Sequence, residues 1–342
     1  MSAAISVPLT ACDNRLATNL IHEMNPLNST DTPNDSPSTQ MCDSLVHRTE
    51  SPRKPVWLAD VALFSVAVIW GINIPIVKDA TTDIDHLVFN AVRLTMGTAT
   101  LFVIAWYSGR NQPRPAIPWM RVSLIGVIGS LVYQYAFIQG IKRATGGDTG
   151  LILGTVPMWT AGLAWIGGIE KLKTGAWFGL LVAAIGTAIV TVRKDGLDIS
   201  NAASMGNLII LLAALLWALA TVLTRQALTS ISPILLAFLM MAIALPGHWV
   251  LAWPKLASWQ AADQTVWLAA IYSGVFSTGI AYALWNLGIK LVGPSHAAAY
   301  QNVAPVIALI ASCLTLGEQI LPTQIIGGPL IIGGLIIMRR NR

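Results

Sequence analysis

Polar and aromatic side chains recur inside segments of this chain that are otherwise apolar, and their types suit the binding of a small molecule. Arg93 lies within one such segment, where an isolated cation is costly and needs a partner. Two interpretations follow. Arg93 anchors a carboxylate of a ligand, or it pairs with Asp79, Asp83 or Asp85 on the preceding loop.

Four tryptophans lie deeper than the membrane-interface positions typical of this residue: Trp70, Trp159, Trp217 and Trp285. An indole N–H away from water needs an acceptor or a ligand, so these rings either line a cavity or pack within a helix bundle. The polar candidates for the same cavity are Asn73, Tyr133, Thr155, Thr221, Tyr272, Ser277, Tyr282, Tyr300 and Asn302. Hydrogen bonding between helices is the alternative for each of them.

Pro157 and Pro305 occupy matching positions in two apolar segments, 148 residues apart. A proline removes one backbone hydrogen bond of a helix, so we expect a kink at each. The kinks serve either as hinges or as static bends that shape a cavity.

The sequence contains no arrangement that strongly indicates catalysis. Ser295 and His296 are adjacent, but a nucleophile needs a base in hydrogen-bond reach, so an intramembrane hydrolase is a disfavoured alternative. Cys12, Cys42 and Cys313 have no spacing typical of a metal site. There is also no phosphate-binding glycine loop. We therefore expect a protein that is not an enzyme and that binds neither a metal nor a cofactor.

The elements that position these residues follow from composition: 54% of the chain is hydrophobic and 11% is charged. This hydrophobic fraction is larger than the core of a soluble protein of ordinary composition can bury, so we expect the chain to lie in a lipid bilayer. The net charge of +5 comes from residues at segment ends, so a nucleic-acid partner is not expected. Ten segments satisfy the length of a membrane-spanning helix: 56–77, 86–107, 118–138, 148–168, 175–193, 205–225, 233–253, 265–287, 295–316 and 321–338. In lipid the backbone polar groups must be bonded within the protein, and these segments lack the alternation of barrel strands, so we expect an all-α fold.

The second half of the chain repeats the first. Trp70 recurs as Trp217 after 147 residues, and Pro157 recurs as Pro305 after 148. We predict a disordered polar tail over 1–54, a first repeat over 55–195 and a second over 196–342. Five helices per repeat is an odd number, so the second repeat must be inverted in the membrane. Inverted repeats are typical of transporters that bind a small-molecule substrate between the halves.

Orientation follows from the basic residues at segment ends. Thirteen Lys and Arg residues fall on one side and six on the other when the N-terminus is placed inside. This distribution predicts a multi-pass protein with both termini in the cytoplasm. The sequence leaves the oligomeric state open.

Taken together, the motifs resemble those of the drug/metabolite transporter superfamily, in its EamA-type ten-helix branch. The first half carries Trp70-Gly71, Pro75, Lys78, Arg93, Pro157, Glu170, Gly179 and Gly186, and the second half carries Pro305, Glu318, Gly327 and Gly334. The resemblance covers residues 56–338. It implies a carrier of the inner (cytoplasmic) membrane, often an exporter of amino acids or related amphipathic metabolites, with helices of both halves around a central cavity. A channel is a further disfavoured alternative.

Overall fold

The computed structural model describes residues 56–110, 116–168, 173–192 and 201–340, and all the regular secondary structure in them is helical. The tail predicted over 1–54 lies outside these residues. Seven helices in the described chain are long and apolar enough to cross a membrane: Ala59–Asp83, His86–Gly109, Trp119–Arg143, Gly146–Ile166, Ala202–Ala227, Pro233–Ala261 and Gln264–Val292. Three shorter apolar helices match the remaining predicted segments: Thr174–Val190, Gln301–Leu316 and Pro322–Met338. The chain is thus an all-α, multi-pass membrane protein, while the count of ten spans stays a prediction for the three shorter helices.

Polar residues in the short connections begin several helices. Asp85 caps α4 (His86–Gly109) and Asp263 caps α12 (Gln264–Ile271), and each accepts a backbone N–H of the first turn at 2.9 Å. The first N–H groups of a helix have no partner within it, and a capping side chain supplies one. These caps let the chain reverse direction within a few residues.

Two helices are interrupted at matching places. They are α7 (Gly146–Leu153) followed by α8 (Val156–Ile166), and α14 (Pro294–Tyr300) followed by the 3₁₀ turn η4 (Gln301–Val303) and α15 (Ala304–Leu316). Each interruption lies just before a proline, Pro157 in α8 and Pro305 in α15. A proline lacks the N–H that would continue the helical ladder, which accounts for the position of both breaks.

Two other helices contain a widened, π-helical stretch. The first runs through α5 (Trp119–Gly126), η1 (Val127–Val132) and α6 (Tyr133–Arg143), and the second through α12, η3 (Tyr272–Ile280) and α13 (Ala281–Val292). A π-helical stretch shifts the direction in which the following side chains point, and such stretches are frequent at functional sites. The two stretches occupy corresponding positions in the two halves.

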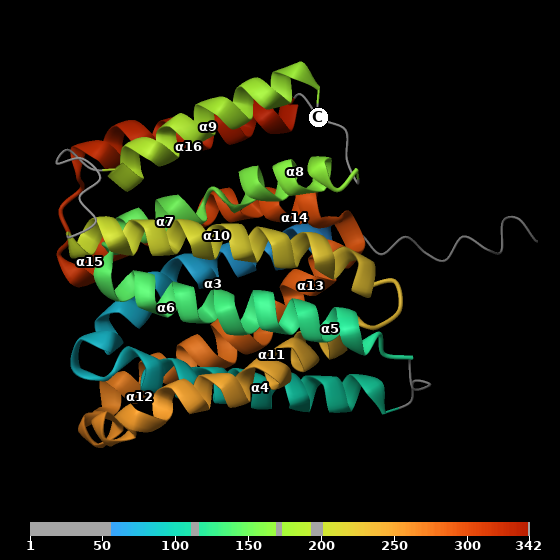
Figure 1. Ribbon diagram of the computed structural model, residues 1–342, viewed down its shortest axis with the longest axis vertical. Helices are drawn as coiled ribbons and strands as arrows, with labels where there is room; N and C mark the ends of the chain where they lie inside the picture. The colour runs from blue at the N-terminus through green and yellow to red at the C-terminus, as the bar shows by residue number, and fades with distance from the viewer. Residues whose placement is uncertain (1–55, 111–115, 169–172, 193–200, 341–342) are drawn as a thin grey trace, which may run out of the picture. The chain divides into compact units, whose positions relative to one another are not determined.

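Packing between helices follows the sequence repeat (Figure 1). The first helix of each half is α3 (Val56–Asp83) or α10 (Ala202–Ala227). α3 packs against α13 and α15, and α10 packs in the corresponding way against α6, α7 and α8. α11 (Pro233–Ala252) packs against α4, and α9 (Thr174–Val192) lies along α16 (Pro322–Arg340). Every one of these contacts joins one half of the chain to the other.

Close backbone approaches repeat with the sequence. A Cβ atom at Gly274 would lie 2.7 Å from the Cβ of Met96, and one at Gly126 would lie 3.4 Å from the Cβ of Ile243. Met96 and Ile243 are 147 residues apart, the offset between the two tryptophans. The same helix–helix contact is therefore made twice, once on each side of the bundle.

Candidate functional site

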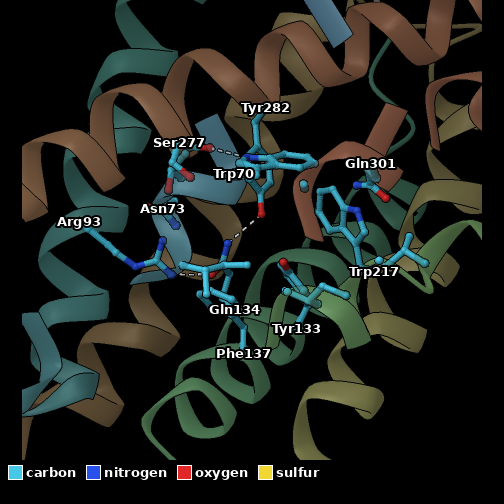
Figure 2. A pocket seen from close by; sticks show the side chains of 17 residues that line it. Trp70, Asn73, Arg93, Tyr133, Gln134, Phe137, Trp217, Ser277, Tyr282 and Gln301 are labelled. Carbon is cyan, nitrogen blue, oxygen red and sulfur yellow. Dashed lines mark hydrogen bonds between the residues drawn. The ribbon is translucent and has the colours of Figure 1, made fainter. Parts of the chain in front are cut away.

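A cavity of about 70 Å³ lies among helices of both halves (Figure 2). This is room for several water molecules. Seven predicted residues line it: Trp70, Asn73, Arg93, Tyr133, Trp217, Ser277 and Tyr282. They come from α3, α4, α6, α10, η3 and α13, so neither half forms the cavity alone.

Arg93 is held in the wall of the cavity by neutral groups. Its Nε and Nη2 donate to Asn90 Oδ1 at 3.0 and 2.7 Å, and Nη2 also donates to Gln134 Oε1 at 2.7 Å. Nη1 donates to Ser273 Oγ at 3.3 Å, and the guanidinium carbon lies 5.7 Å from the centre of the Phe137 ring. The side chain is only 2% exposed. Its charge is therefore solvated by hydrogen bonds but left uncompensated.

The predicted ion pair of Arg93 with a loop carboxylate does not form. None of Asp79, Asp83 and Asp85 lies within ion-pair distance of the guanidinium, and Asp85 instead caps α4. The other interpretation, an anchor for the carboxylate of a ligand, stays a prediction.

A chain of hydrogen bonds extends from Arg93 in both directions. On one side, Gln134 Nε2 donates to the Tyr282 hydroxyl at 2.7 Å. On the other, Asn90 Nδ2 lies 3.3 Å from His248 Nδ1, and His248 Nε2 lies 2.9 Å from the carbonyl oxygen of Ser130. A carbonyl can only accept, so His248 donates from Nε2 and accepts at Nδ1. These hydrogen bonds hold the guanidinium in place from both halves of the protein.

Aromatic rings cluster beside this network. The Trp70 ring centroid lies 5.5 Å from that of Trp217, 5.9 Å from Tyr282 and 5.3 Å from Trp285. Tyr133 lies 5.0 Å from Trp217. These separations are typical of favourable edge-to-face and tilted pairs. Trp285 packs behind Trp70 and does not line the cavity.

Two buried amides in the cavity wall have no partner for their oxygen. Asn73 is 5% exposed and Gln301 is 6% exposed, and neither Oδ1 of Asn73 nor Oε1 of Gln301 accepts a hydrogen bond. A buried polar atom without a partner is unfavourable, so such groups mark places where a ligand or water completes the site. In Figure 2, Asn73 lies on the Arg93 side of the cavity and Gln301 on the Trp217 side.

The remaining candidates lie outside the lining of this cavity: Thr155, Trp159, Thr221, Tyr272, Tyr300 and Asn302. The Thr155 hydroxyl donates to Ile152 O at 2.6 Å and accepts from Trp159 Nε1 at 3.2 Å. Thr221 bonds to the backbone of its own helix at 2.8 Å. All of these bonds join residues three or four positions apart in the chain, so they are neither contacts of the cavity nor the expected bonds between helices.

The other three differ from one another. The Tyr272 hydroxyl donates to Ile69 O at 3.2 Å. The Tyr300 hydroxyl donates to Asp60 Oδ1 at 2.6 Å and thereby joins α14 to α3. Asn302, in η4, has a buried Oδ1 without a partner, so it is the one of the three whose oxygen is left for another molecule.

Pro157 and Pro305 are both buried beside the cavity. The interrupted helices cross there, because a Cβ at Gly150 would lie 2.6 Å from the Cβ of Ala308, and one at Gly154 would meet Pro305 Cγ. The hinge role of the prolines stays a prediction. The side chains of Ser295 and His296 lie outside the described part of the chain.

Several residues of the site were not expected from the sequence. They are Asn90, Gln134, Phe137, His248 and Thr278. Gln134 precedes Tyr135, which the sequence repeat pairs with Tyr282, yet Tyr135 is 38% exposed. The π-helical stretch η1 ends at Val132, immediately before Tyr133 and Gln134. The feature of the sequence that could have identified the asparagine and glutamine among them is the occurrence of amide side chains within apolar segments.

Polar contacts tie the helices together at each end of the bundle. At the Lys78 end, Lys78 Nζ donates to the carbonyl oxygens of Ile141 and Ala144, and Glu318 accepts the N–H groups of Gly146 and Gly147 at the start of α7. At the same end, Asn207 Nδ2 and Gln324 Nε2 donate to the Asp148 carboxylate at 3.1 and 2.8 Å. The opposite, Asp60 end carries the bond between Tyr300 and Asp60. The cavity lies between these two sets of contacts.

Comparison with known proteins also divides the chain into two related halves. The model of the EamA-like transporter family matches the chain twice, over residues 57–192 and 204–340. An uncharacterized transporter, YoaV of Bacillus subtilis, is 27% identical over 279 residues, which cover 81% of this chain and 95% of that protein. A probable terminal-alkyne amino-acid exporter of Streptantibioticus cattleyicolor is 23% identical and covers 84% of this chain and 94% of its own.

A crystal structure of another protein shares the fold, with a TM-score of 0.60 and 20% identity over 82% of this chain and 94% of that one. The matched halves and the cavity between them are features of membrane transporters of small molecules. The chain therefore belongs to the EamA-like transporter family.

Proposed function

We propose that this protein is a secondary carrier of the cytoplasmic membrane that exports small amphipathic metabolites by alternating access, with amino acids first among the candidates. The observation that carries the proposal is the cavity between the halves, in which a buried cation faces a cluster of aromatic rings. A carboxylate bound at Arg93 and an apolar body against Trp70 and Trp217 would use both features. The name of the Streptantibioticus relative favours the same class of substrate.

In this proposal both termini are cytoplasmic, so the Lys78 end faces outward. Opening one end while the other stays closed requires the contacts at the two ends to break in turn. The breaks before Pro157 and Pro305 would serve as the hinges, since unpaired backbone there lets each helix bend locally.

Counterflow in proteoliposomes tests the carrier mechanism. The full chain is reconstituted, loaded with an unlabelled compound and assayed for uptake of the same compound in labelled form. The panel contains L-phenylalanine, L-leucine and 3-phenylpropionate. A carrier gives saturable uptake that is stimulated by the compound on the other side. Linear uptake without such stimulation would indicate a channel, and no protein-dependent uptake of any compound would contradict the proposal.

A further inference from the structure

The cavity contains one fixed positive charge and no fixed negative charge. Arg93 is the only Asp, Glu, Lys, Arg or His among the described residues that line it. The groups that bond to Arg93 are an asparagine oxygen, a glutamine oxygen and a hydroxyl, all neutral. The empty cavity therefore has an excess of one positive charge.

The sequence repeat confines this charge to one half of the protein. Met240, Ala220 and Ala281 stand 147 residues after Arg93, Asn73 and Gln134. The second half thus supplies apolar side chains where the first supplies a cation and two amides. This gives the cavity one polar end, at Arg93 and Asn73, and one largely aromatic end, at Trp217 (Figure 2).

The charge of a ligand decides how well it fits such a cavity. An uncompensated cation away from water is unfavourable, and a carboxylate that reaches Arg93 offsets this cost. A zwitterion brings the same carboxylate together with an ammonium group. The acceptors open to that ammonium are neutral, the Asn73 and Gln301 amide oxygens, and Arg93 repels it. An organic cation meets the same repulsion from Arg93 and brings no carboxylate to offset it, so the amide oxygens and the aromatic rings are its only favourable contacts among the described lining residues.

We propose that the cavity selects amphipathic carboxylates with a net charge of −1, and that the inside-negative membrane potential drives their export. The inference rests on the proposed carrier function, narrows its substrates to anions and places zwitterionic amino acids behind carboxylates that lack the ammonium group. Each turnover moves one negative charge outward and returns the empty carrier unchanged. No carboxylate among the described lining residues is placed to carry a proton with the substrate, and the potential alone supplies a driving force of about 50-fold in concentration ratio per 100 mV.

Three compounds of one skeleton separate the charge classes. 3-Phenylpropionate is the anion, L-phenylalanine has the added ammonium, and phenethylamine lacks the carboxylate. In competition against labelled 3-phenylpropionate, with protein-free liposomes as the blank, we expect the anion to compete at least tenfold better than L-phenylalanine and phenethylamine not to compete. Arg93→Met, which introduces the residue found at the repeat-related position, should abolish this preference, and Arg93→Lys should retain it.

Valinomycin with a potassium gradient tests the driving force at equal pH on both sides. An inside-positive potential of 100 mV should accumulate 3-phenylpropionate about 50-fold inside the liposomes, and reversal of the gradient should exclude it. Both wild-type measurements stand even if a variant does not fold. Equal competition by L-phenylalanine, or accumulation that ignores the potential, would overturn the inference. Saturable counterflow of L-phenylalanine alone would overturn the charge rule and leave the carrier intact, whereas absence of counterflow for every compound would overturn both.

Discussion

At the scale of single residues, Arg93 shows how a membrane protein keeps a charge buried without neutralising it. Three hydrogen-bond partners, Asn90, Gln134 and Ser273, share the guanidinium. Hydrogen bonds to charged groups are worth more than those between neutral groups, so the four bonds that these partners accept offset part of the cost of burial. The part of the burial cost that these bonds do not offset favours the binding of a ligand of opposite charge.

His248 positions this group from a distance. His248→Ala removes the acceptor for the Asn90 amide and leaves that amide and the Ser130 carbonyl unpaired. A buried unpaired group costs about 1–3 kcal/mol, so we expect the apparent KM of the transported probe to rise about tenfold. Counterflow kinetics give the KM. Asn286→Ala is the matched control, since Asn286 is equally buried but bonds to Pro233 O, and it should leave the KM unchanged.

Trp70 makes three ring contacts in the aromatic cluster beside the cavity. Trp70→Ala deletes three ring contacts and the bond from its indole N–H to Ser277 O at 3.0 Å. We expect at least tenfold weaker competition by 3-phenylpropionate, because aromatic pairs are worth about 0.5–1.5 kcal/mol each beyond the area they bury. Trp165→Ala, at a ring that contacts Trp177 on the exposed surface, is the control. An equal loss in both variants would mean that Trp70 acts on folding alone.

The sequence predicted how deep in the membrane the candidate residues lie better than it predicted which way their side chains point. Trp70, Arg93 and Trp217 line the cavity as their position in apolar segments suggested. Tyr272 and Thr221 come from equally plausible positions and bond to backbone instead. Direction depends on helix phase, and the π-helical stretches change that phase without any proline or glycine pattern that reveals them in advance.

At the scale of helices, the breaks near Pro157 and Pro305 were predictable, because proline removes a specific hydrogen bond. The contact between the two broken helices was not, since it depends on how the halves assemble. Glu318 illustrates the same limit: it follows α15 in sequence, yet its carboxylate accepts the first backbone N–H groups of α7 in the other half.

Gly150 tests the crossing of the broken helices. Gly150→Val forces atoms into the space of Ala308, and overpacking of this kind costs about 1–3 kcal/mol. We expect a lower midpoint of thermal unfolding in detergent and a slower counterflow rate. Gly162→Val, in α8 of the same span, adds a side chain where nothing lies within 4 Å and should change neither.

Gly186 tests the contact between α9 and α16. A Cβ there would lie 2.7 Å from the carbonyl oxygen of Gly327, so Gly186→Leu must push the two helices apart. We expect a lower yield of folded protein and a lower midpoint of thermal unfolding. Gly333→Leu, in α16 but without neighbours within 4 Å, provides the comparison. An equal loss of yield and thermal stability in both variants would mean that the substitutions act through helix propensity or membrane insertion, and not through the contact between α9 and α16.

At the scale of the whole molecule, the predicted orientation places the α10–α11 turn in the cytoplasm and the segment after α11 outside. Ser230 and Gln260 are exposed at these two places. With the three native cysteines replaced, Ser230→Cys should resist a membrane-impermeant thiol reagent added to intact cells, and Gln260→Cys should react. Labelling in the reverse order would invert the orientation and with it the proposed direction of export.

The composition of the chain and its internal repeat were enough to predict a helical bundle in a membrane, because lipid leaves helices few alternatives. They did not reveal which end of the bundle is sealed in a given conformation. That depends on contacts such as Tyr300 with Asp60, between residues that are 240 positions apart.

The crossing of α7 and α15 at their breaks has a mechanical consequence. Gly150 and Gly154 leave no gap against Ala308 and Pro305, so neither broken helix can swing without displacing the other. We therefore expect the two broken helices to move together. Under the proposed alternating access, we expect this coupling to keep the two ends of the cavity from opening at the same time, so that ions do not leak through the protein.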